Sequence, residues 1–395
     1  MTVFDELVGQ EMAAHELQVA SADASSLLTG GAGPSMTHAW LFVGPPGSGR
    51  SIAARVFAQA LQCPDGGCGT CAQCRDVRAG THPDVSIVEP AGVHYSVADV
   101  RELVAQSSSS PIRGRWRVIV LEDADRLESQ QMDWKPANVL LKAIEEPAPH
   151  MVWVLCAPSL QDVIATVRSR CRVLSLRTPS IAEVTDVLVN KYGADPDLAV
   201  TAARVSQGHI GRARRFITDP EVRERHREVM ELPTSLASLT DCLEAAARFD
   251  STAEDSGKDQ VRERHAQERD DVRASYGVGS RGIEARGAAK ALGDLEKMHK
   301  KRARRARSDA ADLALLELLA YYRDVLMLQW GADVGLINDE YADQLQHEAS
   351  TSTPEVTMRR IEAVLETRAT LSGNAVPRLV LESLFATLRD PVAVR

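Results

Sequence analysis

Apolar residues in the first half of the chain fall into short runs separated by amphipathic stretches. Five runs have the length and apolar content of buried strands, namely residues 40–43, 84–89, 116–121, 151–155 and 172–176. Apolar residues at helical spacing fill some of the intervals, as in residues 96–106 and 138–145. Buried strands that alternate with helices are typical of a parallel sheet covered by helices on both faces. The first 175 or so residues are therefore predicted to form an α/β domain.

The strand pattern stops after Thr178 and Pro179, and the rest of the chain has helical spacing. Ser180 and Glu183 stand at the spacing of a capping box, so a helix is expected to begin there. From about Phe216 onward the pattern predicts a helical bundle with short loops. Its regularly spaced apolar residues include Leu313, Leu316, Leu319, Leu326, Trp330, Met358, Ile361, Leu365, Leu381, Leu384, Phe385 and Leu388.

Residues 250–307 interrupt this pattern. They contain few large apolar residues, and they end in a strongly basic run at residues 300–307. One interpretation is a solvated loop or a long, mobile helix inserted in the bundle. The other is an electrostatic contact with DNA, although no aromatic residue is interleaved in the basic run to stack on bases.

Composition narrows the possible classes of protein. A length of 395 residues suggests two or three domains. The formal net charge of -9 predicts no global attraction to nucleic acid, so any DNA contact must be local. No apolar run reaches the ~18 residues that a membrane span requires.

Four cysteines lie close together, at positions 63, 68, 71 and 74. Four thiolates at this spacing can surround one tetrahedral zinc at about 2.3 Å each and leave no open position for catalysis. Disulfides are the alternative. However, residues 1–6 lack the basic and apolar parts of a signal peptide, so we expect a cytoplasmic location in which thiols stay reduced. The spacing therefore predicts structural zinc held by Cys63, Cys68, Cys71 and Cys74.

A glycine-rich segment precedes this cluster. Residues 44–51 fit the Walker A pattern through Gly44, Gly47, Gly49 and Ser51, but Arg50 stands where lysine normally reaches the phosphates. A wide, planar guanidinium does not replace a compact ammonium group. The backbone cradle and the hydroxyl are retained, so weak binding of ATP with Mg²⁺ is possible and efficient turnover is not expected.

A second departure from the ATPase pattern follows the predicted strand at residues 116–121. A Walker B strand normally offers Asp for the metal and then Glu for water, whereas this chain has Glu122 followed by Asp123. Positioning errors of ~1 Å can cost ~100-fold in rate. The two departures together indicate a degenerate ATPase site. A glycine loop that holds no nucleotide at all is the alternative.

Eight segments in order along the chain resemble the delta-prime subunits of the bacterial DNA polymerase III clamp loader, in their actinobacterial form. They are residues 7–10, the glycine loop, the four cysteines, and residues 80–84, 121–125, 138–147, 168–171 and 208–213. The last 180 or so residues resemble the family only in helical pattern and order. The stretch before Asn138 departs from the family, and a helix is expected to start at Pro136, since proline is tolerated in a first turn.

The resemblance implies three domains. Residues 1–178 would be an α/β AAA+ module with a RecA-like parallel sheet and a zinc knuckle inserted at residues 63–74. Residues 179–232 would be a helical lid. Residues 233–395 would be an all-α collar that contains the charged insertion at about 250–307.

The resemblance also implies a function. Such a chain would be a non-motor subunit that helps load the sliding clamp onto primed DNA. Its partners would be the gamma/tau motor subunits and the delta subunit in a hetero-pentamer. It would belong to a DNA-directed DNA polymerase holoenzyme and have little or no ATPase activity of its own.

Two arginines match family motifs. Arg170, between Ser169 and Cys171, matches a motif that supplies an arginine finger to the ATP of the next subunit; such fingers are worth ~10³–10⁵ in rate in other NTPases. From the residues alone, Arg170 is an exposed arginine at a turn. Arg212 matches the lid arginine that senses nucleotide.

Two other functions stay open. The chain could be an active ATPase motor of the same loader in which Arg50 is tolerated. It could also be a zinc-stabilised AAA+ adaptor outside replication.

Overall fold

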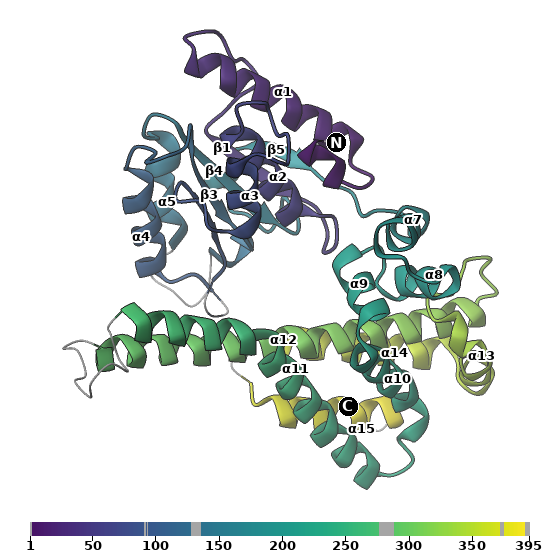
Figure 1. Cartoon of the computed structure of the whole chain (residues 1–395). Coiled ribbons are helices and arrows are strands. Elements are labelled where there is room, and N and C mark those ends of the chain that lie inside the picture. Colours follow the sequence, from purple (N-terminus) through teal and green to yellow (C-terminus); the bar gives the residue numbers. More distant parts are fainter. Residues whose placement is uncertain are drawn as a thin grey trace. The chain divides into compact units, whose positions relative to one another are not determined.

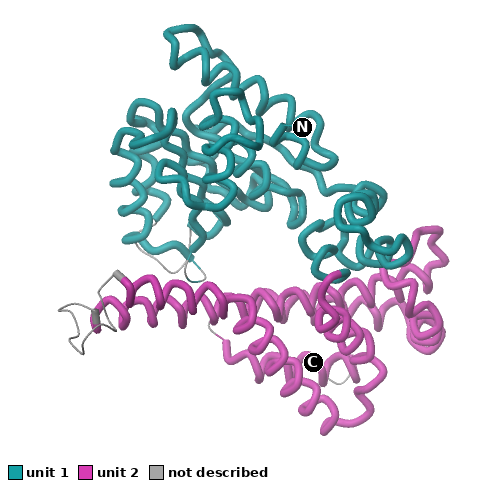
Figure 2. Tube along the Cα trace, in the orientation of Figure 1, with its two compact units in different colours: residues 1–217 teal, residues 218–395 magenta. Residues whose placement is uncertain are grey.

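The chain folds into two compact units, residues 1–217 and 218–395, shown in teal and magenta in Figure 2. This is a computed structural model, and it describes residues 2–90, 92, 94–127, 136–275, 288–371 and 375–391. Unit 1 contains a sheet and helices, and the described part of unit 2 is helical. The three-domain division at residues 178 and 232 stays a prediction. Within the described residues, none of the helices has the length and apolarity needed to cross a membrane.

Unit 1 is built on a five-stranded parallel sheet with the strand order β2-β3-β4-β1-β5. The strands are β1 (Ala39–Val43), β2 (Val85–Val88), β3 (Arg117–Leu121), β4 (Met151–Ala157) and β5 (Arg172–Ser175). Every residue of the central strands β1 and β4 is buried, which is why their sequences are apolar throughout. The predicted α/β class is confirmed.

Helices cover both faces of the sheet (Figure 1). On one face, α1 (Glu11–Leu28) and α2 (Arg50–Gln62) pack on Trp40 and Phe42. On the other face, α4 (Val97–Ser107) and α5 (Pro136–Glu145) pack on alternate residues of the same strands. Helix α5 begins at Pro136 as predicted, and residues 128–135 lie outside the described part. The short helices of this unit are η1 (Val3–Glu6), α3 (Ala72–Ala79), η2 (Ala124–Leu127) and α6 (Ala165–Arg168).

Three helices lie at the end of unit 1, namely α7 (Ile181–Tyr192), α8 (Pro196–Val205) and α9 (Ile210–Thr218). The last residue of α9 is the first residue of unit 2. The capping box predicted at the start of α7 is confirmed. The backbone N–H of Glu183 donates to Ser180 Oγ at 3.3 Å, and the backbone N–H of Ser180 donates to Glu183 Oε2 at 2.7 Å.

Unit 2 is all helical in its described part, as predicted. Its helices are α10 (Pro220–Ser235), α11 (Leu239–Ser275), α12 (Ala288–Gln329), η3 (Asp339–Tyr341), α13 (Ala342–Thr351), α14 (Pro354–Leu371) and α15 (Pro377–Arg389). Buried aromatic residues from α12 and α15, among them Tyr321, Tyr322 and Phe385, form the centre of its core.

The charged segment at residues 250–307 belongs to α11 and α12, which run side by side (Figure 1). Residues 276–287 of this segment lie outside the described part. A Cβ placed on Gly257 of α11 would lie 2.5 Å from the backbone nitrogen of Arg307 on α12, so glycine permits a close helix contact there. Arg307 also pairs with Asp250 at 2.5 Å. Of the two forms expected for a solvated segment, a loop or a long helix, residues 250–275 and 288–307 are helical. The contact with DNA stays a prediction.

A buried carboxylate fixes the loop before β3. Asp84, which is 1% exposed, accepts the backbone N–H groups of Ile112, Arg113 and Gly114 at 2.6, 2.8 and 2.5 Å. Arg117 donates to the same carboxylate at 3.1 Å. Burial acts to raise the pKa of Asp84, but the three backbone donors outweigh it and the pKa lies below its usual value.

We predict that Asp84→Ala lowers the free energy of unfolding by about 3 kcal/mol, because four donors lose their buried acceptor. Asp84→Asn keeps the shape and one acceptor, so it should recover part of the loss. Because the pKa of Asp84 is lowered on folding, its contribution is present above the unfolded pKa of about 3.9 and is lost as pH falls through the folded pKa. Urea unfolding at neutral and acidic pH measures this, and a pH-independent gap between wild type and Asp84→Asn would contradict it.

Candidate functional site

The carboxyl ends of β1, β3 and β4 meet at one edge of the sheet, and most of the predicted nucleotide residues gather there. The glycine loop joins β1 to α2, and Glu122 and Asp123 follow β3 directly. Cys156 lies near the end of β4, opposite Phe42 of β1. We call this group of residues the strand-end site.

The glycine loop has the backbone that a phosphate cradle requires. Gly47 and Gly49 have φ values of +92° and +87°, which side-chain-bearing residues rarely adopt. A Cβ on Gly44 would lie 2.5 Å from the carbonyl oxygen of Leu176. Gly49 is the N-cap of α2, so the loop leads into a helix N-terminus whose free N–H groups attract anions.

Positive groups from two helices approach this loop. Arg50 is half-buried, and its Nη1 is buried without a hydrogen-bond partner among the described residues. His209, just before α9, lies against the loop, since a Cβ on Gly47 would be 2.8 Å from the His209 Cβ. Burial and, to a smaller extent, the charges of Arg212 and Arg50 lower the pKa of His209 to about 4. The structure thus brings Arg50 and Arg212 to the same imidazole.

The carboxylates at this edge are engaged within the protein. Glu122 is 8% exposed. Burial is the main cause that raises the pKa of Glu122. Burial raises the pKa of the Cys156 thiol, and the neighbouring Glu122 carboxyl acts in the same direction. Asp123 has a left-handed backbone, with φ of 50°, and its Oδ2 lies 3.8 Å from Nε of Arg126.

Sequence reasoning missed two members of the strand-end site. Cys156 is not among the predicted site residues, and the structure buries it in β4 close to Glu122. His209 was noted only as part of a family motif. Their positions follow from the insertion of β4 between β3 and β1 and from the packing of α9 on the glycine loop, and no local pattern in the sequence signals either.

Arg170 makes its contacts with residues outside the strand-end site. It stands in the turn between α6 and β5, and its side chain is 39% exposed. Its Nε donates to Glu145 Oε1 at 2.5 Å, and its Nη1 donates to the carbonyl oxygen of Thr166 at 2.8 Å. The next residue, Cys171, is half-buried, and burial raises the pKa of its thiol to about 12.

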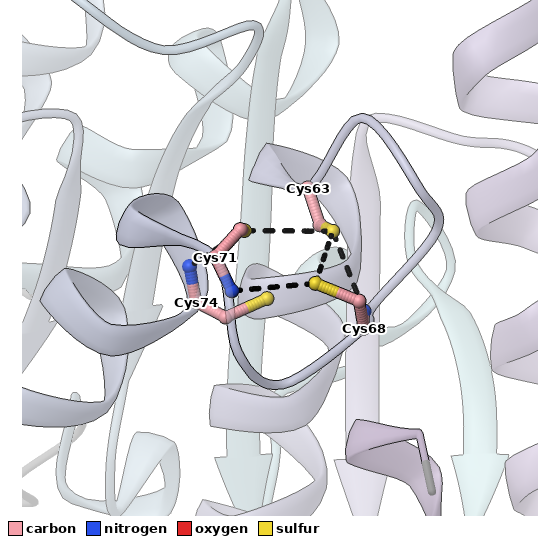
Figure 3. A group of neighbouring side chains, drawn as sticks. All are labelled: Cys63, Cys68, Cys71 and Cys74. Atoms are coloured by element: carbon pink, nitrogen blue, oxygen red, sulfur yellow. Dashed lines mark hydrogen bonds between the residues drawn. The ribbon is translucent and has the colours of Figure 1, made fainter.

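The four clustered cysteines converge in space (Figure 3). All four sulfur atoms lie within 4.8 Å of one another, and Cys63 Sγ is 3.6 Å from Cys68 Sγ and 3.7 Å from Cys71 Sγ. Four Zn–S bonds of 2.3 Å at tetrahedral angles place the sulfur atoms about 3.8 Å apart. The donor set and its spacing therefore fit one tetrahedral metal ion, with all four positions taken by the protein.

Backbone donors surround these sulfurs. The N–H groups of Cys68, Cys71 and Cys74 donate to the sulfurs of Cys63, Cys68 and Cys71 at 3.4, 3.4 and 3.5 Å. Hydrogen bonds from Thr70 lower the pKa of Cys68 to about 6. Burial raises the pKa of Cys71 and Cys74. A bound dication would hold all four thiols as thiolates.

The cysteine knuckle is tied to the core of unit 1. Cys63 and Cys74 are fully buried, and the Gln59 side chain donates to the Cys74 carbonyl oxygen at 2.9 Å. Arg115 donates to the carbonyl oxygen of Cys63 at 3.0 Å. The backbone N–H of Val3 donates to the carbonyl oxygen of Gly67 at 2.9 Å. Metal in the knuckle would therefore brace the N-terminus, α2 and the loop before β3 together.

Comparison with known proteins adds the family. A model of the family described as "DNA polymerase III, delta subunit" matches residues 26–180. DNA polymerase III subunit delta' of Bacillus subtilis is 25% identical over 358 residues, which is 90% of this chain and 92% of that protein. The chain is thus similar to a DNA polymerase III delta-prime subunit over most of its length.

Other relatives match a smaller part. Subunit delta' of Pseudomonas aeruginosa is 30% identical over 200 residues, 49% of this chain and 60% of that protein. Subunit gamma/tau of Mycobacterium tuberculosis strain H37Rv is 33% identical over 172 residues, 42% of this chain and 27% of that protein. This delta-prime-type chain thus spans about a quarter of the gamma/tau relative, and nearly all of the Bacillus delta' protein.

We predict that the purified chain carries one zinc ion in the cysteine knuckle. Cys74→Ser should release it and lower the free energy of unfolding by at least ~3 kcal/mol, because structural zinc in isolated peptides contributes ~10–16 kcal/mol of binding free energy to folding. Elemental analysis and thermal unfolding measure the two effects. Cys171→Ser, a half-buried cysteine outside the cluster, is the control and should keep the zinc. Protein purified without chelator and lacking stoichiometric zinc would rule the site out.

Proposed function

We propose that this chain is a non-motor subunit of the DNA polymerase III clamp loader and supplies Arg170 to the ATP of a neighbouring subunit. In this role it helps load the sliding clamp onto primed DNA. The delta' and gamma/tau relatives support a place in that loader. The proposed non-motor role rests on the residues of the strand-end site.

Hydrolysis in glycine-loop NTPases needs a lysine on the phosphates, a Mg²⁺ held by the loop hydroxyl and the strand carboxylate, and an oriented water. Here Arg50 replaces the lysine. The Glu122 carboxyl is 8% exposed, and its burial raises its pKa. Asp123, which follows Glu122, lies beside Arg126. Arg50 in place of lysine and Glu122 followed by Asp123 both depart from this requirement, which supports a chain that does not turn over ATP.

Arg170 has the exposure that a finger acting on another chain needs. Its ion pair with Glu145 is at the surface, with side-chain exposures of 39% and 45%. Surface ion pairs of this kind contribute ~0–1 kcal/mol. Arg170 can therefore leave Glu145 for the phosphates of a neighbour at little cost. A guanidinium placed there would stabilise the charge of phosphoryl transfer.

The proposed partners are the gamma/tau motor subunits and the delta subunit in a hetero-pentamer, with the clamp and primed DNA reached through the complex. Unit 2 would make the collar contacts. An active ATPase motor of the same loader is the second candidate, because the gamma/tau relative is 33% identical over its matching part. An adaptor outside replication is the third, and copurification with loader subunits distinguishes it from the others.

We predict that the isolated chain hydrolyses ATP negligibly, because Arg50 and the Glu122–Asp123 order both remove groups that hydrolysis needs. Arg50→Lys should not restore activity while the carboxylates keep their order. A steady-state ATPase assay decides this, and turnover near ~1 s⁻¹, within the normal range of enzymes, would favour the motor candidate.

We predict that Arg170→Ala reduces ATP hydrolysis and clamp loading by the assembled, DNA-stimulated complex. The loss should be partial, since one ATP site of several borders this chain. The thermal midpoint of the isolated chain should change little, because the side chain is exposed. Arg170→Lys keeps the charge but loses the planar donors, so it should not rescue the rate fully.

The matched control is Glu145→Ala, which removes the partner of Arg170 and leaves the arginine in place. It should keep or raise the ATPase rate of the complex. If Arg170→Ala leaves both rates unchanged in a ring that has assembled correctly, Arg170 is an ordinary surface residue.

A further inference from the structure

Helix α2 buries two glutamines near its C-terminal end. Gln59 is 0% exposed and Gln62 is 1% exposed, although a buried amide is unfavourable unless its polar atoms are hydrogen-bonded. Gln62 has partners at both ends of its amide. Its Oε1 accepts the backbone N–H of Arg115 at 2.9 Å, and its Nε2 donates to the carbonyl oxygen of Trp116. Gln59 has a partner at one end only, so core packing alone does not account for a glutamine there.

The one partner of Gln59 belongs to the cysteine knuckle. Its Nε2 donates to the carbonyl oxygen of Cys74 at 2.9 Å, and its Oε1 is buried without a hydrogen-bond partner among the described residues. The Cys74 carbonyl fixes which end of the amide faces it, since two carbonyl oxygens repel each other. A methionine of similar size would avoid the unpartnered oxygen but would lose the bond to Cys74. Glutamine at this position therefore favours the placement of Cys74 over the stability of the core.

Arg115 holds a second ligand residue in the same way. Its Nη1 donates to the carbonyl oxygen of Cys63 at 3.0 Å. Arg115 follows the three backbone N–H groups that Asp84 accepts, so a buried carboxylate sets its place in the loop before β3. We call Cys63 and Cys74, which are both 0% exposed, the buried pair. Their main-chain carbonyls are held from outside the knuckle, one by this loop and one by α2.

The other two ligand residues, Cys68 and Cys71, form the exposed pair. Both are partly exposed, and their hydrogen bonds in the described structure come from residues 63–75. Their loop is joined to the N-terminal segment at Gly67, whose carbonyl oxygen accepts the backbone N–H of Val3 at 2.9 Å. The four ligands thus divide into a pair fixed by the core and a pair carried by a loop.

We propose that Gln59 and Arg115 are positioning residues for the metal ion of the cysteine knuckle. They hold the buried pair in the arrangement of ligands before the ion binds, and the exposed pair closes over it. Ligands that are already in place lose less conformational freedom on binding, so the affinity for the ion rises. This inference rests on the zinc prediction and is independent of the proposed place in the clamp loader.

Metal affinity and stability together test Gln59. Gln59→Met should weaken Zn²⁺ binding to the full-length chain by ~10–100-fold, as the loss of a contact that orients a ligand does at other metal sites. Competition with a chromophoric chelator measures this. The thermal midpoint of the metal-free variant should be unchanged or higher, because a buried unpartnered oxygen is removed. A merely structural role predicts a lower midpoint instead. At saturation with Co²⁺, the visible spectrum should match that of the wild type, because all four thiolates remain.

Arg115 gives a second, independent pair of variants. Arg115→Ala should weaken Zn²⁺ binding by ~10-fold, and Arg115→Lys, which keeps a donor, should recover part of the affinity. The side chain is half-buried, so these variants decide the question if Gln59→Met does not fold. The matched control is Gln10→Met. Gln10 is 6% exposed and donates to the carbonyl oxygen of Ser48 at 3.1 Å, so its loss should lower the thermal midpoint and leave the Zn²⁺ affinity unchanged.

Thiol labelling of the metal-free chain tests the division of the ligands into two pairs. An alkylating reagent followed by peptide mass spectrometry should modify the exposed pair before the buried pair in the wild type. Gln59→Met should speed the labelling of Cys74, and Arg115→Ala should speed that of Cys63. Each effect should fall on one cysteine, because each side chain holds one carbonyl.

Two results would overturn the inference. One is a Zn²⁺ affinity of Gln59→Met and of Arg115→Ala within ~3-fold of the wild type. The other is equal labelling of all four cysteines in metal-free wild type that circular dichroism shows to be folded. A wild-type chain without affinity for Zn²⁺ would defeat the zinc prediction and this inference with it. None of these results bears on the proposed non-motor role.

Discussion

The parallel pairing of β1 with β4 is the constraint on which the strand-end site depends. The register sets Phe42 opposite Cys156 and Val43 opposite Ala157, so the glycine loop and the end of β4 leave the sheet at the same level. Because β4 also pairs with β3, Glu122 emerges beside the same edge. Without this strand order, the loop, the carboxylates and the Cys156 thiol would have no reason to meet. The order is stabilised by apolar packing on both faces of β1 and β4, which are fully buried.

Helix α2 connects the two candidate sites. It begins at Arg50 beside the glycine loop and ends before Cys63, the first knuckle ligand, after 13 residues or about 20 Å. Most of its inner face is buried against the sheet, where Phe57 lies 5.2 Å from Trp40 between ring centroids. Its position is therefore fixed by the core, and both ends are positioned together. Gln62 at its last turn accepts the backbone N–H of Arg115 at 2.9 Å, so the knuckle and the loop before β3 share this support.

The sequence predicted those features of the fold that depend on residues close together in the chain. The five strands, the start of α5 at Pro136 and the capping box at Ser180 all appear where apolar runs or single residue types place them. The convergence of the four cysteines was also predicted, since their spacing alone confines them. The thiol of Cys156 against Glu122, the His209 contact with Gly47 and the bonds of Asp84 depend on strand order and on loops that meet across long sequence separations. No short stretch of the sequence predicts these long-range contacts.

The basic run of α12 shows how packing changes the meaning of a charge pattern. In sequence it resembles a DNA-binding segment, but several of its cations are used between the helices. Arg302, with a side-chain exposure of 16%, donates to Glu268 at 2.8 Å, and Glu268 also contacts His299 at 2.9 Å and Arg264 at 3.0 Å. These bonds lower the pKa of Glu268 to about 2, against the effect of its burial.

Exposed cations of α12 form ion pairs within the helix instead of between the two helices. Lys300 pairs with Glu296 at 3.2 Å, one turn away, with side-chain exposures of 76% and 68%. Pairs of this kind are worth ~0.3–0.5 kcal/mol and are weakened by salt, so such a lysine can exchange its partner for a phosphate. The arginine at 302 cannot do so without taking one of three partners from the partly buried Glu268 carboxylate, which costs more than breaking an exposed pair. Any contact of this segment with DNA would therefore fall to its exposed cations Lys300, Lys301 and Arg304, while Arg302 and Arg307 hold α11 and α12 together.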